Sequence, residues 1–358
     1  MRVTIIGAGI AGITAALALD RAGHAVTLLE RSPSASPVGA GITLAPNAVR
    51  ILIGLGVDLS AAGFPLPSLS VRTADGSPLQ TIDVSRILPG APPLLAFDRY
   101  DLHTALIAAL PAGIPVQFDQ PYPASPLPEH DLLIGADGIR SAVRESLDGA
   151  IPLRYSGTTC WRALAPNPGV HESFEAWGGA SRFGVVPLSR DRIYVYLVRT
   201  APRGLPRQTS IDAIRQHFEN FAEPVPIILE ALAGATLLHH DLEELPSPHW
   251  GGDRTLLIGD AAHAMTPNLG QGAGMSIEDA AILPQVVTAS NPAQALRTLR
   301  HKRVAHIQKH SRITGDVAHW QSTPAILLRN ALFRITPVSV SDRNYRNVIE
   351  PGLDLQSR

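Results

Sequence analysis

The sequence has little cysteine and little charge, and it lacks long apolar runs. Its one cysteine, Cys160, excludes an internal disulfide bond and a cysteine-rich zinc site. Charged residues are only 17% of the chain and the formal net charge is -1, so the basic surface of a nucleic-acid-binding protein is missing. No apolar run reaches the roughly 18 residues that span a membrane. We therefore expect a cytoplasmic protein without a nucleic-acid partner, a membrane span or a bound metal.

Apolar residues are abundant, at 45% of 358 residues, which is enough for two domains with large cores. The chain opens with "RVTIIGAGIAGITAALALDRAGHAVTLLER", which predicts a strand at Val3 to Ile6, a helix at Ile13 to Arg21 and a strand at Ala25 to Leu29. Strands that end in a turn recur in "HDLLIGADGIRSAVRESL" and "RTLLIGD". The first segment has the size of a βαβ unit.

These βαβ-type segments are separated by stretches that alternate apolar and polar residues. We predict an α/β fold with a discontinuous Rossmann-like cofactor domain made of residues 1–65, 94–150 and 250–300. Residues 66–93 and 151–249 are expected to form an inserted substrate domain, an antiparallel sheet. Residues 301–358 are expected to be a C-terminal helical segment, with an amphipathic helix at 324–335. A further helix is expected at 210–233.

The first motif is "GAGIAG", which places glycine at positions 7, 9 and 12. Gly7 allows a tight turn, Gly9 lets the backbone approach a pyrophosphate, and Gly12 lets the helix pack close to the strand. The next predicted strand ends at Glu30, whose carboxylate is suited to the hydroxyls of a ribose. Strand, turn, helix and acid therefore predict a dinucleotide site.

Two later motifs stand in a fixed order after the first. "ADGIRSAVR" contains Asp137, and "GDAAHAMTPNLGQGAGMSIEDA" contains Asp260 and a loop rich in glycine. Together with "GAGIAG", they resemble the glycine turn, the DG motif and the GD motif of the class A, single-component FAD-dependent aromatic monooxygenases. This is the para-hydroxybenzoate and salicylate hydroxylase-like family, and the resemblance covers residues 1–315.

The resemblance implies the para-hydroxybenzoate hydroxylase type of FAD-binding domain and a role for each matching residue. NADPH or NADH is expected to bind transiently, because no second glycine motif is present, and O2 is the expected co-substrate. The implied FAD contacts are Gly7, Gly9 and Gly12 at the pyrophosphate, Glu30 at the ribose, Arg31 near the adenine, Gly41 in a mobile-flavin loop, Arg99 and Asp137 elsewhere along FAD, Asp260 at the ribitol or pyrophosphate, and Pro267, Gly270, Gly272 and Ala273 at the isoalloxazine ring.

The same resemblance implies hydroxylation of a small aromatic or heteroaromatic substrate through a flavin hydroperoxide. Since the flavin supplies this chemistry, no protein side chain is assigned as catalytic. The substrate is expected to contact the inserted sheet and the GD-motif loop. Candidate pocket residues are Trp161, Arg162, Arg182, Tyr194, Tyr196 and Pro267.

Other activities fit the same motifs. Arg182 and Tyr194 are twelve positions apart, a spacing that resembles the flavin-dependent urate hydroxylases. Epoxidation and Baeyer–Villiger oxygenation use the same type of intermediate, and a flavoprotein reductase of the geranylgeranyl reductase type uses the same fold. The expected assembly is a monomer or a homodimer.

Overall fold

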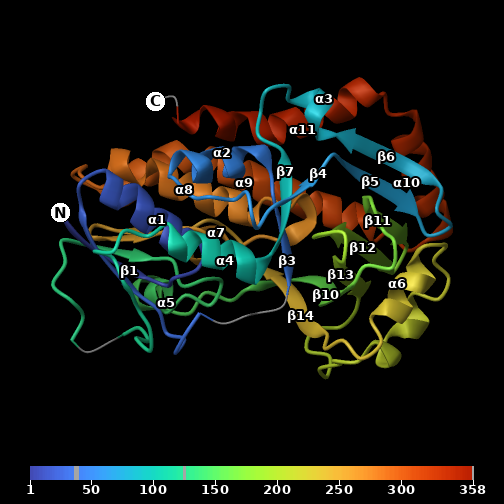
Figure 1. Ribbon diagram of the computed structural model, residues 1–358, viewed down its shortest axis with the longest axis horizontal. Helices are drawn as coiled ribbons and strands as arrows, with labels where there is room; N and C mark the ends of the chain where they lie inside the picture. Colours follow the sequence, from blue (N-terminus) through green and yellow to red (C-terminus); the bar gives the residue numbers. More distant parts are fainter. Residues whose placement is uncertain (36–39, 124–125, 357–358) are drawn as a thin grey trace.

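The computed structural model describes residues 1–35, 40–123 and 126–356, and its strands form three sheets (Figure 1). A six-stranded sheet and a seven-stranded sheet each carry their own hydrophobic core. A three-stranded sheet, in the middle of Figure 1, lies between them. The α/β fold class is confirmed, with the Rossmann-like unit, the inserted sheet and the C-terminal helices that the sequence predicts.

The six-stranded sheet has the order β15-β16-β9-β1-β2-β8 and is parallel except at β15. On one face lie α1 and α8, which pack together, and on the other lie α5 and α7. Both faces are thus covered, which is why β9 is wholly apolar and β1 is buried from Val3 to Ile6. The elements are β1 (Arg2–Ile6), α1 (Ile10–Arg21), β2 (Ala25–Leu29), β8 (Val116–Gln117), β9 (Leu132–Gly135), α5 (Ala142–Asp148), β15 (Gly251–Gly252), β16 (Thr255–Leu257), α7 (Asp260–His263) and α8 (Gly272–Val286).

The seven-stranded sheet has the order β14-β10-β13-β12-β11-β5-β6 and is antiparallel except for the β5–β11 pair. Side chains alternate between its faces. One face holds a core under α6 and two 3-10 turns, and the other faces the three-stranded sheet and the C-terminal helices. The elements are β5 (Ser68–Thr73), β6 (Pro78–Asp83), β10 (Arg154–Pro166), β11 (Ser173–Gly178), β12 (Ser181–Pro187), β13 (Arg192–Thr200), η1 (Ile211–Ala213), η2 (Arg215–His217), α6 (Val225–Ala231) and β14 (Leu238–Glu244).

The continuous helix expected at 210–233 is wrong. Only α6 is an α-helix there, and it begins beside Pro224 and Pro226, which are tolerated only in the first turn of a helix. The preceding residues form the single turns η1 and η2.

The three-stranded sheet and the C-terminal helices complete the fold. In the small sheet, β7 pairs with β3 and β4. The helix predicted at 324–335 is α10. Among the described residues, no helix is long and apolar enough to cross a membrane. The remaining elements are β3 (Gly41–Leu44), α2 (Pro46–Gly54), β4 (Phe64–Leu66), α3 (Val84–Ile87), β7 (Leu94–Asp98), α4 (Arg99–Ala108), η3 (Pro267–Leu269), α9 (Pro292–Ala318), α10 (Thr323–Ile335), α11 (Val338–Leu353) and η4 (Asp354–Gln356).

Candidate active site

The carboxyl edge of the six-stranded sheet collects the acidic residues that the motifs single out. Glu30 follows β2, Asp137 follows β9, and Asp260 follows β16, while the glycine turn follows β1. These strands are parallel, so their carboxyl ends share one edge. β1 lies between β2 and β9, and this is the crevice in which open α/β sheets bind ligands.

The glycines of the first turn differ in what surrounds them. A Cβ on Gly12 would lie 1.8 Å from the carbonyl oxygen of Gly7, and a Cβ on Gly7 would lie 2.5 Å from that of Ala136. Gly7 also has a φ of 102°, which disfavours any side chain. A Cβ on Gly9, by contrast, would meet nothing within 4 Å. Gly7 and Gly12 therefore hold the turn against its neighbours, whereas Gly9 faces open space at the start of α1.

Glu30 closes the other side of this space. Its carboxylate accepts hydrogen bonds from the backbone N–H groups of Ala8 (2.8 Å) and Ser32 (2.9 Å). Burial alone would raise the pKa of Glu30, but the hydrogen bonds from Ser32 and Ala8 outweigh it, and the pKa is lowered. An ionised acid thus borders a cavity of about 200 Å³. The cavity is lined by Ala8, Gly9, Ile10, Glu30, Ser32, Ser34, Ala35, Arg99, Tyr100, His103 and Phe118.

Arg99 and Asp260 lie further along the same cleft, each open to solvent on one side. Burial lowers the pKa of Arg99, and the nearby charge of Arg162 lowers it further. Burial likewise raises the pKa of Asp260, although His263 and Arg99 oppose this shift. Within the described residues, neither side chain has a hydrogen bond or an ion pair to the protein. This charged cleft, with open space at Gly9, fits a group that carries both phosphates and hydroxyls, such as FAD.

Asp137 and Arg31 are placed differently from the other predicted cofactor residues. The Asp137 carboxylate accepts bonds from the Ser141 hydroxyl (2.5 Å) and the Ala142 N–H (2.7 Å), so it caps α5. Arg144 of the same motif donates to the carbonyl oxygen of Ala261 (2.7 Å) and thereby joins the DG motif to the GD motif. Arg31 is exposed and does not line the cavity.

The loop after Asp260 presents backbone to the cleft. Gly270 has a left-handed φ of 61°, and a Cβ built there would lie 3.6 Å from the Thr43 hydroxyl of β3. A Cβ built on Gly272, at the start of α8, would meet nothing within 4 Å. Pro267 is exposed. No side chain of the described residues caps the first turn of α8. The backbone N–H groups in the first turn of α8 therefore have no side-chain partner among these residues. They favour a negative charge in the part of the cleft that they face, as at other helix N-termini.

A buried ionic network lies behind this loop, and sequence reasoning missed it. Arg300 of α9 contacts Glu278 and Asp279 of α8 at 2.7 Å each, and all three side chains are at most 1% exposed. Asp279 also contacts His263 Nε2 at 2.5 Å and accepts the N–H of Gly259. Burial raises the pKa of both acids, but their cationic neighbours outweigh it, so both pKa values are lowered. Two adjacent acids within an otherwise apolar helix are the sequence signal from which such a network could have been predicted.

The inner face of the seven-stranded sheet carries four of the predicted substrate residues, Arg162, Arg182, Tyr194 and Tyr196. Tyr196 donates to the Glu175 carboxylate (2.8 Å), and Arg182 contacts the same carboxylate at 3.2 Å. Arg182 also donates to Asn268 (2.8 Å), the residue after Pro267, while its Nε has no partner among the described residues. Tyr194 lies on this face, beside Tyr196. Arg182, only 3% exposed, therefore links the sheet to the GD-motif loop.

Trp161 is not a pocket residue, and this prediction is wrong. It lies on the opposite face of the sheet, fully buried, and stacks on His239 with ring centroids 4.7 Å apart. Alternation along β10 instead places Arg162 on the inner face, near Tyr194 and Arg99. Gly41, expected to contact FAD, packs against Tyr194: a Cβ at position 41 would lie 2.3 Å from the tyrosine ring.

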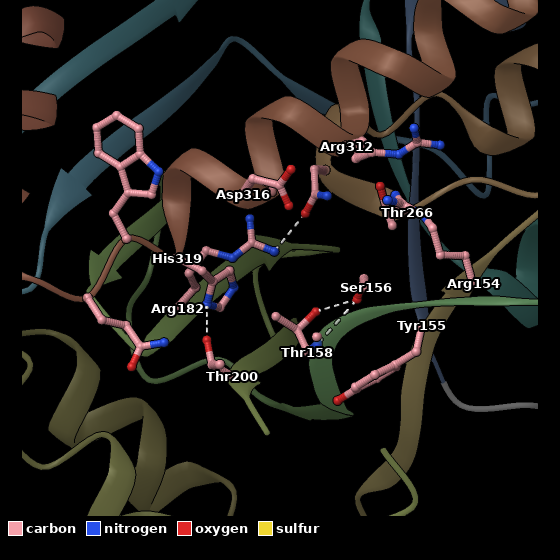
Figure 2. A pocket seen from close by; sticks show the side chains of 15 residues that line it. Arg154, Tyr155, Ser156, Thr158, Arg182, Thr200, Thr266, Arg312, Asp316 and His319 are labelled. Carbon is pink, nitrogen blue, oxygen red and sulfur yellow. Dashed lines mark hydrogen bonds between the residues drawn. The ribbon is translucent and has the colours of Figure 1, made fainter. Parts of the chain in front are cut away.

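A second cavity, of about 300 Å³, borders Arg182 (Figure 2). Asp316 of α9 and His319 project into it from one side, and Ser156 and Thr158 of β10 from the other. Burial and the neighbouring Arg182 lower the pKa of His319 to about 3, so this histidine is neutral. The lining is Arg154, Tyr155, Ser156, Gly157, Thr158, Arg182, Thr200, Thr266, Asn268, Arg312, Gly315, Asp316, His319, Trp320 and Gln321. It includes Arg182 but not the other predicted substrate residues.

Comparison with known proteins agrees with this geometry. The model of the "FAD binding domain" family matches residues 1–120 and 129–313. The 2-heptyl-3-hydroxy-4(1H)-quinolone synthase of Pseudomonas aeruginosa is 37% identical, over 94% of each chain. The 6-hydroxynicotinate 3-monooxygenase of Bordetella bronchiseptica is 30% identical, over 88% of this chain and 91% of that one.

A solved structure resembles the whole fold. HpxO of Klebsiella pneumoniae, complexed with FAD and uric acid, has a TM-score of 0.86 at 25% identity, and the match covers 98% of this chain and 97% of that one. The family match, the relatives and the fold agree with the three ordered motifs. The chain belongs to the FAD binding domain family and, within it, to the class A FAD-dependent aromatic monooxygenases.

Proposed function

We propose that this monooxygenase hydroxylates a nitrogen heteroaromatic ring of the 4-quinolone type. The quinolone synthase and the hydroxynicotinate monooxygenase are both named for oxygenated nitrogen heterocycles. The observation that carries the proposal is the position of Arg182, a buried cation between the sheet and the GD-motif loop with an unpartnered Nε. Such a group suits the ring oxygen of an electron-rich heterocycle, because a guanidinium binds developing negative charge.

FAD is proposed to extend along the cleft at the carboxyl edge of the six-stranded sheet. Its pyrophosphate would lie at Gly9, its ribose at Glu30, and its central part between Arg99 and Asp260. The isoalloxazine ring would lie against the backbone of Pro267, Gly270, Gly272 and Ala273. The open space at Gly9 and the unpartnered charges of the cleft support this placement.

When bound, FAD accepts electrons from NAD(P)H and activates O2 for transfer to the ring. The chain contributes orientation and electrostatics. The N-terminus of α8 stabilises negative charge at the edge of the cleft that it faces. Burial raises the pKa of Tyr194 and Tyr196, so both hydroxyls stay protonated near neutral pH, and Tyr196 donates its proton to Glu175. The seven-stranded sheet, which faces the GD-motif loop, would exclude water from the isoalloxazine ring.

The domain division predicted from the sequence is also part of the proposal. The strands of the seven-stranded sheet fall within residues 66–93 and 151–249, which supports treating these segments as the substrate domain. A cytoplasmic location and a monomeric or homodimeric state remain proposals. The single buried cysteine supports a reducing compartment.

A substrate panel tests the proposed chemistry. The FAD-loaded enzyme is given NADH or NADPH with 2-heptyl-4(1H)-quinolone, 6-hydroxynicotinate or uric acid, and we expect the quinolone to give the highest coupled turnover. NAD(P)H oxidation, O2 uptake and peroxide release are measured together, and mass spectrometry shows whether one oxygen atom enters the substrate. Coupled turnover with uric acid alone would favour the urate type, and consumption of substrate without O2 would favour a reductase.

A further inference from the structure

Helix α10 and the start of α11 expose several large apolar side chains. In α10, positions 327, 328, 331, 332 and 335 lie within an arc of about 140° at 3.6 residues per turn. Both helices lie on the outside of the molecule, and α10 lies beside the edge strand β6 (Figure 1). The exposed fractions are 64% for Leu327, 55% for Leu328, 48% for Leu332, 73% for Ile335, 60% for Val338 and 44% for Val340. We call these six residues the α10 face.

The side of α10 that faces the protein holds one of its two arginines. Arg329 is 1% exposed, and its guanidinium lies 5.2 Å from the centroid of the Trp177 ring and donates to the carbonyl oxygen of Ala318 (2.9 Å). Phe333 meets the same tryptophan edge-on. A surface helix ordinarily turns its apolar stripe to the core and its charges to water. In α10, by contrast, Leu327, Leu328 and Leu332 face outward while Arg329 is buried, so packing against the core does not account for these leucines.

The charges around the α10 face are mainly positive. Between residues 323 and 349 the exposed charged side chains are Arg334, Arg343 and Arg346. The carboxylate in that range, Asp342, is buried and paired with Arg86 at 2.6 Å. Asp75, in the turn between β5 and β6, interacts electrostatically with Arg334, but its carboxylate is already bonded within its own turn. Apolar residues beside exposed arginines are the composition of helices that lie in an anionic membrane interface.

We propose that the α10 face docks this enzyme on an anionic lipid bilayer, with the leucines at the acyl boundary and the arginines at the headgroups. A second copy of the chain is a weaker partner for this face. Two-fold pairing would cover the leucines but bring Arg334 and Arg343 of both copies together, while Asp342 is already used by Arg86. Trp320 and Gln321, directly before α10, form part of the wall of the larger cavity.

Vesicle co-sedimentation tests the proposal with the FAD-loaded enzyme and no substrate, so its outcome is independent of the substrate assignment. We expect binding to vesicles of phosphatidylcholine with phosphatidylglycerol, weaker binding to phosphatidylcholine alone, and loss of the difference at high salt. The double variant L328D/I335D should bind at least about tenfold more weakly. Arg334→Gln should weaken binding by about fivefold, and only to the anionic vesicles. The matched control is Ile227→Asp, on α6, where Ile227 is 46% exposed; it should bind like the wild type.

FAD absorbance and thermal unfolding of each variant establish that the fold is intact. The proposal is wrong if the wild type stays in the supernatant with both vesicle types, or if L328D/I335D sediments as well as the wild type. It is equally wrong if the wild type is a dimer that does not bind vesicles and L328D/I335D makes it a monomer. That last result, seen by size-exclusion chromatography with light scattering, would assign the α10 face to a second copy.

Discussion

Nε2 of His263 and Oδ2 of Asp279 lie 2.5 Å apart at a site where neither side chain is more than 1% exposed. The same carboxylate oxygen accepts the N–H of Gly259, the residue before Asp260. Asp279 thus fixes the turn that aims Asp260 into the cleft. The fully buried Arg300 balances the charge of Asp279 from α9, so the turn, α8 and α9 form one unit.

Replacing Asp279 with asparagine should destabilise the protein by about 3–5 kcal/mol, because Arg300 would keep a buried charge with one partner removed. FAD should also be released more easily, since Gly259 loses its charged acceptor. Urea unfolding and the FAD content after gel filtration measure the two effects. Asp253→Asn, at an exposed acid near the end of β15, is the control and should leave both unchanged.

Acid should unfold the protein through this network. The pKa values of Glu278 and Asp279 are lowered in the folded state, so the stability that they contribute is present above the unfolded values near 4 and is lost as the pH falls through the folded values. The free energy of unfolding should therefore drop below about pH 4. In Asp279→Asn the drop should be shallower. An equal slope in wild type and variant would show that Asp279 does not contribute.

Alanine substitution should affect different properties at two glycines of the first turn: the stability of the fold at Gly12 and the affinity for FAD at Gly9. Gly12→Ala should destabilise the fold by about 1–3 kcal/mol, since its Cβ has no room. Gly9→Ala should leave the FAD-free protein stable, because Gly9 has an ordinary φ of -78° and open space around it. It should weaken FAD affinity by about tenfold, a loss of about 1.4 kcal/mol. Thermal melting without FAD and fluorescence titration with FAD separate the effects; normal FAD affinity in Gly9→Ala would displace the proposed pyrophosphate site.

Replacing Asp260 with asparagine should weaken FAD retention while changing the stability of the FAD-free protein little. Asp260 is exposed, and its side chain has no hydrogen bond or ion pair to the described residues, so its charge contributes little to folding. Differential scanning fluorimetry with and without added FAD gives both quantities. A variant that keeps FAD as well as the wild type would remove Asp260 from the proposed site.

Arg182→Ala should raise the KM for the substrate by about 10-fold to 100-fold, as expected for a lost hydrogen bond to a charged group. FAD content should not change. Steady-state kinetics with coupled O2 uptake measure KM and kcat separately. Arg190→Ala, at an exposed arginine in the turn between β12 and β13, is the matched control. Equal KM values for the two variants would leave Arg182 as a structural link between Glu175 and Asn268.

The sequence predicted those parts of the fold that depend on local pattern. The glycine turn, Glu30 and the strand before Asp260 combine short spacing with apolar periodicity, and the structure places all of them at one sheet edge. Trp161 was misplaced because alternation along β10 separates two faces without telling which one meets the cofactor cleft. The contacts of Arg300 with Glu278 and Asp279 join separate helices, and such pairing depends on tertiary packing.

Gly41 and Tyr194 occupy what amounts to one shared volume: the missing side chain of the first is filled by the ring of the second. In protein engineering, positions 41 and 194 therefore have to be changed together. A bulkier residue at position 41 requires a smaller one at 194, and trimming the tyrosine to admit a larger substrate creates room for a side chain at 41. A library that varies either position alone would sample mostly clashes or voids, whereas one that varies both would sample different pocket shapes on an intact fold.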